Sequence, residues 1–467
     1  MTRYRVDPRV KTNPSVRQGE VGRRSSPVEH RTSRERPNTG LELPQAPWAV
    51  ATDPVICDGG VGGLRMHEQR DRIKVSVMVP AVLVPLSAVI PAFLVGTMAV
   101  QFNDVFGVGP AQIGLGAAAF AIGPLLFAPV MGRSVGRMGI STALRTAVLL
   151  SLGGMICAAI APTFTVIAAA MFLAGLGSAF AHPAANALVA AGIPEGRFGI
   201  AFAIKQSAIP LGMMVAGLAV PLIAESLGFR WTFAVMFAFP LLALATIPSH
   251  SPTARGRSEG AIPRDLKLGA WLVAFGVAFG AFAASALATH AVSGAVATGM
   301  TASAAGYLVF GAGLFGLSVR LVAGSVADRV RGRALLATAA LLAVGSVGWI
   351  LMSGQTVFLF IIGILVANGF GWGWPGLYHL ALARRFPTAT AAATGIALSG
   401  ISSGMLLGPS LVGLLADVNW TFAWLACAAV ALIGACVLLL AERQLEVADS
   451  PSRRARMMGP SDSQERH

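Results

Sequence analysis

The chain has 467 residues and a formal net charge of +14, and 55% of its residues are hydrophobic while only 12% are charged. Such a composition, with uninterrupted apolar runs of about 20 residues, excludes an ordinary soluble globule and indicates helices that cross a bilayer. Most of the positive charge lies before residue 75 and in short loops between apolar runs, a distribution typical of membrane topology rather than of nucleic-acid binding.

The N-terminal segment, residues 1–73, is rich in Arg, Pro, Ser and Glu and has no hydrophobic period. It is predicted to be a disordered basic tail. Because no apolar core follows its early basic residues, it does not resemble a signal peptide. A start of translation at Met66 is an alternative. The tail has little aromatic content for stacking on bases, so we expect contact with anionic lipid and no nucleic-acid partner.

Twelve apolar runs follow this tail. They lie near residues 75–100, 111–131, 142–161, 164–188, 198–222, 231–247, 268–290, 303–326, 334–353, 355–382, 392–416 and 419–441. We therefore predict an all-α integral membrane protein with twelve transmembrane helices. The chain then divides into an N-terminal half of six helices (74–248), a cytoplasmic linker (249–267), a C-terminal half of six helices (268–441) and a C-terminal tail (442–467).

Positive charge alternates between the loops, and this alternation predicts the orientation of the helices. Every second loop is basic, and these loops together hold thirteen Lys or Arg residues. The loops between them hold only Arg230. Lys and Arg are retained on the cytoplasmic side of a membrane. Both termini are therefore predicted to be cytoplasmic, in a multi-pass protein of the cell membrane whose surrounding partner is the lipid bilayer.

The two halves repeat one another in sequence. The segment GRSVGRMG at 132–139 follows the second run, and GSVADRVRG at 324–332 follows the eighth run, six spans later. The fifth and eleventh runs align without gaps over 199–217 and 395–413. Two six-helix halves in parallel repeat are typical of one architecture of secondary transporters, so we predict two pseudo-symmetric bundles.

With these features, residues 75–441 resemble the major facilitator superfamily (MFS). The loop signature of that family runs Gly, three residues, Asp-Arg, one residue, Gly and then basic residues. Gly324, Asp328 and Arg329 fit it, and Gly332 and Arg333 follow with one extra residue. The resemblance implies secondary transport by alternating access, a monomer, and a loop that latches the two halves on the cytoplasmic side.

The first-half copy of this loop departs from the family pattern. It has Gly132, Arg133, Arg137 and Gly139, but Gly136 stands where Asp is usual. The resemblance therefore implies a lopsided latch in which the second copy is the stronger. The plainer interpretation is that the Arg residues of both copies only hold their loops inside.

Three glycines of the eleventh run, Gly400, Gly404 and Gly408, recur every four residues and so lie on one helix face. Small residues let helix backbones approach closely. This face is predicted either to pack tightly against a neighbouring helix or to slide between the halves.

Two cations lie deep within spans, where charge is costly and indicates function. Lys205 is seven residues into the fifth run, and Arg320 is six residues from the end of the eighth run. At about 1.5 Å per residue, each lies about 10 Å inside, and they belong to opposite halves. The point charge of a lysine and the planar, forked guanidinium of an arginine together suit a carboxylate. Alternatively, either side chain reaches out to the cytoplasmic face.

Other polar and aromatic residues in the spans are weaker candidates. His182 and His379 lie near cytoplasmic ends and are candidates for proton coupling, because histidine titrates near neutral pH. Alternatively, both are only polar residues at the edge of the membrane. Four further side chains are candidate lining of the substrate cavity: Asn186, Gln206, Trp374 and Tyr378.

These features favour a secondary transporter of a small organic solute, and among such solutes an organic anion. Drug or metabolite efflux is the alternative, although the fifth span lacks the Gly-Pro pair usual in the drug antiporters of the family and the spans hold no carboxylate for a cationic drug. A non-transporting receptor or scaffold is an alternative of another class. We see no phosphate-binding loop, catalytic set or metal-ligand spacing, so we expect no enzyme, no cofactor and no metal.

Overall fold

A computed structural model describes residues 74–194, 197–249, 262–329, 334–386 and 389–449, without the side chains of 128–133, 198–199, 326–329, 391 and 449. In these ranges every regular element is helical. The apolar runs explain this outcome, because a backbone in lipid must satisfy its hydrogen bonds within each segment. The predicted all-α class is confirmed.

The N-terminal half is built from nine helical segments. They are α2 (Val75–Thr97), α3 (Ala99–Phe106), α4 (Pro110–Met138), α5 (Ile140–Ala159), α6 (Phe164–Gly192), α7 (Phe198–Gln206), α8 (Ala208–Ala219) with a π-helical turn (Val220–Ala224), α9 (Glu225–Met236) and α10 (Ala238–Thr246). Gly228, with φ of 79°, breaks α9 internally and lets the chain reverse there.

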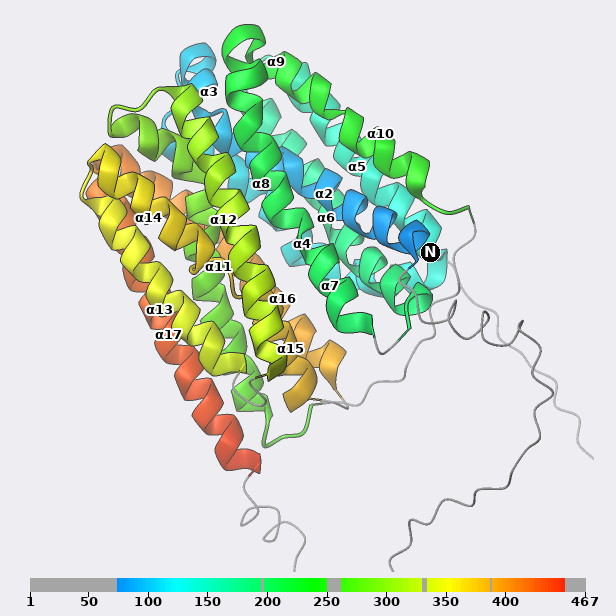
Figure 1. The fold of residues 1–467 in the computed structure, drawn as a ribbon. Helices are drawn as coiled ribbons and strands as arrows, with labels where there is room; N and C mark the ends of the chain where they lie inside the picture. The colour runs from blue at the N-terminus through cyan, green and yellow to red at the C-terminus, as the bar shows by residue number, and fades with distance from the viewer. Residues whose placement is uncertain (1–73, 195–196, 250–261, 330–333, 387–388, 450–467) are drawn as a thin grey trace, which may run out of the picture. The chain divides into compact units, whose positions relative to one another are not determined.

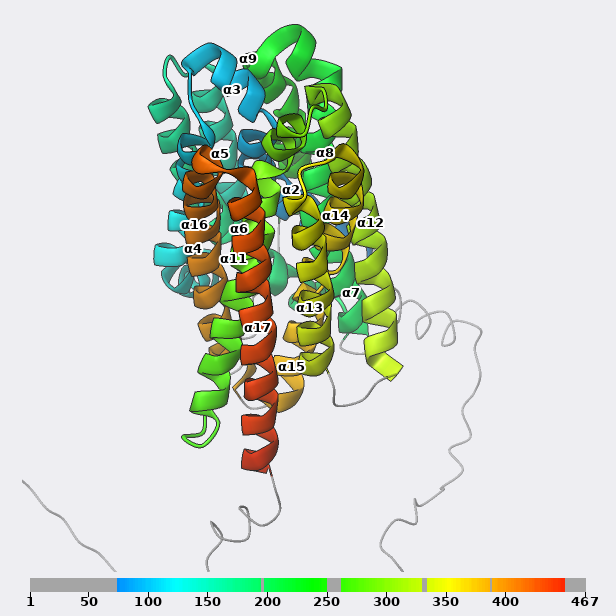
Figure 2. The same ribbon diagram turned by 90° about the vertical axis from the view of Figure 1, so that its left-hand side faces the viewer.

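The C-terminal half is built from seven helices. They are α11 (Lys267–Ala297), α12 (Ala302–Arg329), α13 (Ala334–Ser353), α14 (Val357–Gly369), α15 (Pro375–Arg385), α16 (Thr390–Val418) and α17 (Trp420–Asp449). Figures 1 and 2 show α17 alongside α11 and α13, and both contacts are extensive.

Ten helical stretches of the described residues are long and apolar enough to cross a membrane. One of them, Ile200–Thr246, has 47 residues, which at about 1.5 Å per residue is about twice the thickness of a bilayer core. Another apolar helix, Val357–Gly369, is shorter than a full span and is followed by α15. A multi-pass membrane protein is thus confirmed, while the count of twelve and the cytoplasmic termini stay predictions.

The last helix runs further than the sequence indicated. It continues to Asp449, into the predicted C-terminal tail (442–467). Glu442 accepts an ion-paired hydrogen bond from Arg385 at 2.8 Å, and Leu445 is buried against Gly269. These contacts stabilise two more helical turns beyond the apolar run.

The glycine stripe of α16 packs within its own half. A Cβ atom at Gly400, Gly404 or Gly408 would collide with backbone carbonyl oxygens of α11. The stripe therefore brings α16 and α11 into close contact, as small residues do between membrane helices. Of the two predictions for this face, tight packing is the one the geometry supports.

The boundary between the halves is closed at one end, which we name the Asp417 end; it also carries α3 and the first residues of α4 and α12 (top of Figure 1). There Gly114 of α4 lies against the carbonyl of Pro409 in α16, and Gly217 of α8 faces Gly306 of α12. The opposite end carries α15 and the last residues of α17, and we name it the Arg385 end. It is the end that the loop charges predict to be cytoplasmic.

Candidate substrate site

Lys205 is the penultimate residue of the short helix α7, and its side-chain amine is buried. The residue is 3% exposed, and its Nζ lies 3.3 Å from Nδ1 of His182 on α6 and donates to Oε1 of Gln206 at 3.3 Å. The chain tightens directly after it, where the Ser207 amide donates to the carbonyl of Ile204. The side chain thus points into the protein and does not reach out to the membrane surface.

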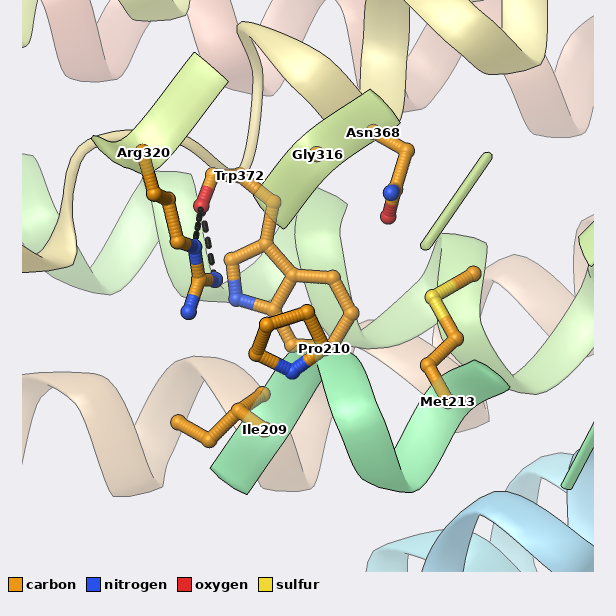
Figure 3. A pocket seen from close by; sticks show the side chains of 7 residues that line it. All are labelled: Ile209, Pro210, Met213, Gly316, Arg320, Asn368 and Trp372. Atoms are coloured by element: carbon orange, nitrogen blue, oxygen red, sulfur yellow. Dashed lines mark hydrogen bonds between the residues drawn. The ribbon is translucent and has the colours of Figure 1, made fainter. Parts of the chain in front are cut away.

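Arg320 of α12 spans the boundary between the halves. Its Nε and Nη2 donate to the carbonyl of Trp372 at 3.1 and 2.8 Å, and its Nη1 lies 3.5 Å from the carbonyl of Gln206 (Figure 3 shows the two bonds to Trp372). The guanidinium carbon also lies 5.8 Å from the centre of the Trp372 ring. One cation therefore contacts the backbone of both halves.

Local sequence explains why these two carbonyls accept from Arg320. Pro210 has no amide hydrogen, so it cannot bond to the carbonyl four residues earlier, which is that of Gln206. Trp372 lies in the break between α14 and α15, where the chain is not helical over residues 370–374. Glycines at 369, 371 and 373 favour that break. Interrupted helices of this kind supply backbone groups to substrate sites in transporters.

A histidine from the second half joins the same region. His379 of α15 stacks on Tyr378, with ring centres 4.1 Å apart, and lies within electrostatic range of Lys205 and His182. We name His182, Lys205, Arg320 and His379 the basic cluster. Two of its members come from each half, so the boundary between the halves runs through it.

No carboxylate balances the basic cluster in the described part of the chain. Neither Lys205 nor Arg320 forms an ion pair there, and the one ion pair in these ranges joins Arg385 to Glu442. Burying a cation without a counter-charge is costly. The cluster is consequently suited to bind an anion.

A small cavity lies beside the cluster (Figure 3). Its volume is about 10 Å³, which is close to the space of one water-sized group. Both halves line it: Ile209, Pro210 and Met213 come from α8, and Gly316, Arg320, Asn368 and Trp372 come from α12, α14 and the break.

The structure brings together only part of the predicted site. Five of the predicted residues converge: Lys205, Gln206, Arg320, His182 and His379. Asn186 is half-buried on α6, and its Oδ1 has no hydrogen-bond partner among the described residues.

Trp374 and Tyr378 instead pack in the core of the second half. The Trp374 indole donates to the Gly371 carbonyl at 2.9 Å, and its ring covers Gly280.

Two residues of this region, Trp372 and Asn368, escaped the sequence analysis. The glycine-rich interruption NGFGWGW at 368–374 is the signal that would have pointed to both, because glycines at every second position are unusual inside a span.

The predicted latch loops are described only in part. Gly139 adopts φ of 85° between α4 and α5, and Arg137 is exposed. Gly324 lies in α12 with open space around it. Gly332 and Arg333 lie outside the described residues, as do the side chains of Arg133, Asp328 and Arg329 and the surroundings of Gly132. The latch stays a prediction.

Comparison with known proteins shows which family has this architecture. The family model described as Major Facilitator Superfamily matches residues 81–384 and 268–462. A bacterial homologue of the human lysosomal transporter Spinster, solved inward-facing and unoccupied, aligns with a TM-score of 0.64 and 15% identity over 81% of this chain and 100% of its own. A D-xylose–proton symporter aligns with a TM-score of 0.62 and 16% identity over 78% of this chain and 96% of its own.

No curated protein sequence matches significantly. The family match spans both halves and the segment between them, and the solved structures share the fold. Proteins of this family and fold are generally not enzymes. The chain is therefore a member of the major facilitator superfamily, a family of membrane transporters.

Proposed function

We propose that this transporter carries a small organic anion, with a carboxylate group, by alternating access. The observation that supports the proposal is the basic cluster: four cationic or titratable groups, two from each half, with no carboxylate partner in the described ranges. A bound carboxylate would supply the missing counter-charge. A cationic solute would be repelled by the same groups, which makes cationic-drug efflux the weaker alternative.

Arg320 links this site to the conformational change. In the present state its guanidinium is shared between the Gln206 carbonyl of one half and the Trp372 carbonyl of the other. A carboxylate is a better partner for a guanidinium than a neutral carbonyl. The anion would therefore draw Arg320 and Lys205 together across the boundary, and its release would let the halves separate.

We further infer that protons are the coupling ion, with His182 and His379 as acceptors once a bound anion offsets the charge of Lys205. Bound anion and bound proton have opposite charge, so each favours the binding of the other. We further propose that the protein is a monomer of the cell membrane with both termini in the cytoplasm, as the loop charges predict.

Uptake into proteoliposomes tests the anion proposal. Labelled carboxylates, neutral solutes and cationic solutes are offered to wild type, Lys205→Ala and Arg320→Ala. Saturable carboxylate uptake that falls at least ~100-fold in both variants is expected, since each removes a charge-assisted bond in a site shielded from water.

Arg230→Ala is the matched control, because Arg230 also donates to a backbone carbonyl, that of Ala159 at 3.2 Å, but lies at the Asp417 end. It should transport as wild type does. Uptake of cationic or neutral solutes alone, unchanged in the Lys205 and Arg320 variants, would refute the proposal.

A further inference from the structure

Asn368 presents an unused hydrogen-bond acceptor to the cavity beside Arg320. The residue is 4% exposed, and its Nδ2 donates to the carbonyl of Ala312 on α12. Only the nitrogen of the amide can donate to a carbonyl, so this bond fixes which way the amide faces. Its Oδ1 is buried without a hydrogen-bond partner among the described residues. A buried acceptor left in this way is costly and indicates a function.

Gly316 makes room for that amide. A Cβ atom at residue 316 would come within 2.6 Å of Nδ2 of Asn368, so a larger residue there would displace the side chain. Gly316 and Arg320 are four residues apart on α12, which puts them on one helix face about 6 Å apart along the axis. Figure 3 shows Gly316, Arg320 and Asn368 around the same cavity.

The cavity therefore combines two complementary features. Arg320 offers N–H donors that suit a carboxylate, and Asn368 offers an oxygen that accepts from an O–H or N–H group. The cavity volume of about 10 Å³ matches one water-sized group, such as a hydroxyl. An ammonium group is disfavoured as the donor, because Lys205 and Arg320 would repel it.

We propose that Asn368 is a specificity-determining residue that accepts a hydrogen bond from a hydroxyl group of the substrate, so that the transported anions are hydroxycarboxylates. This inference rests on the proposed function, because it assigns the carboxylate to the basic cluster. It adds the second recognition group and narrows the substrate class.

Matched pairs of acids that differ by one hydroxyl group test the inference in proteoliposomes. Lactate is compared with propionate, malate with succinate, and citrate with tricarballylate. We expect wild type to prefer the hydroxylated member of the transported pair by about 10–100-fold in kcat/KM, because an acid without the hydroxyl leaves Oδ1 unpaired.

Two variants then remove the acceptor in different ways. Asn368→Leu has a similar volume and no acceptor, and Gly316→Ala displaces the amide. Both should lower the preference to within about 3-fold while uptake of the deoxy acid persists. Asn103→Leu is the matched control, because the Asn103 amide also donates to a carbonyl, that of Val108 at 3.1 Å, at the Asp417 end. It should keep the wild-type preference.

The outcomes separate this inference from the proposed function. Equal uptake of both members of every pair, with dependence on Lys205 and Arg320 retained, overturns the role of Asn368 and leaves the anion site standing; the acceptor would then be satisfied by water alone. A preference that survives Asn368→Leu overturns it as well. Failure of every carboxylate to be taken up overturns the proposed function itself.

Discussion

The boundary between the two halves is built differently at its two ends. At the Asp417 end, backbones touch: Gly114 lies against the Pro409 carbonyl, and Gly413 lies against that of Pro110. Towards the Arg385 end, a Cβ atom at Gly324, Gly376 or Gly395 would meet nothing within 4 Å. The basic cluster lies between these two regions. Small residues thus close one end, while basic groups line the proposed substrate site.

Two carboxylates reinforce the closed end in a pseudo-symmetric way. Asp417 of the second half accepts from the amide of Ala111 at 3.3 and 3.4 Å, and Glu225 of the first half accepts from the hydroxyl of Ser303. Ala111 and Ser303 are the second residues of α4 and α12, which occupy equivalent places in the repeat. A carboxylate at a helix N-terminus is favoured by the partial positive charge there. Each half therefore holds the other through a carboxylate at the start of a helix, although one donor is a backbone amide and the other a serine hydroxyl.

Apart from the loss of Lys205 or Arg320 themselves, the largest expected effect is at a backbone contact of the closed end. Gly114→Ala puts a Cβ atom into the Pro409 carbonyl, and the helix backbone on either side cannot yield cheaply. We expect carboxylate uptake to fall more than ~10-fold, because the halves no longer close at this end. The opening of the boundary at the Asp417 end is measured by labelling Ala416→Cys with a membrane-impermeant maleimide, in a protein whose four native cysteines are replaced by Ser. Ala416 is suitable because it is only 6% exposed in the closed boundary.

Gly311→Ala is the control for this change. Residue 311 also lies in a helix, but a Cβ atom there would meet nothing within 4 Å. Alanine has the higher helix propensity at both sites, by about 1 kcal/mol, so only the contact separates the two variants. Equal uptake by Gly114→Ala and Gly311→Ala would show that this close approach does not close the boundary.

A smaller effect is expected where one cation bridges the halves. Arg320→Lys keeps the charge but loses the planar fork that reaches both the Trp372 and Gln206 carbonyls. We expect about a 10-fold rise in KM for the carboxylate, with residual transport above that of Arg320→Ala. Lys267→Arg, at the start of α11, is a charge-conserving control. If Arg320→Lys transports as wild type does, a point charge is sufficient at this position.

Pro210 should have a smaller influence, through the backbone. Pro210→Ala restores an amide hydrogen that can bond to the Gln206 carbonyl and so competes with Arg320 for that oxygen. A shift of about 2–10-fold in KM is expected, which is the size of one net hydrogen bond. Pro240→Ala in α10 is the matched control, and an equal shift there would assign the effect to general helix straightening.

The smallest expected effect concerns the carboxylates of the closed end. Asp417→Asn and Glu225→Gln each keep a hydrogen-bond acceptor but remove the charge, so each should weaken closure by about 0.3–1 kcal/mol. That corresponds to about a 2–5-fold faster labelling of Ala416→Cys, and the double variant should approach the product of the two. No change in labelling would show that the glycine contacts alone hold this end.

Sequence predicted the architecture because the responsible forces act locally. Apolar runs, loop charges and the repeat between 199–217 and 395–413 each depend on one segment or on a comparison of two segments. Lys205 and Arg320 stood out for the same reason, since a cation deep in an apolar run is costly wherever the run packs.

Packing alone decided which groups meet at the site. Trp374 and Tyr378 looked like lining residues, yet they lie in the core of the second half, while their neighbour Trp372 offers its carbonyl to Arg320. Arg320 and Trp372 are 52 residues apart, and Arg320 and Gln206 are 114 apart.

No local pattern encodes the rotation of one helix against another. The pairing of Asn368 with a cavity beside Arg320 arises only when segments from both halves come together. Sequence by itself therefore determined the membrane fold, its repeat and its two deep cations, whereas tertiary structure decided their partners, because these depend on side-chain direction across packed helices.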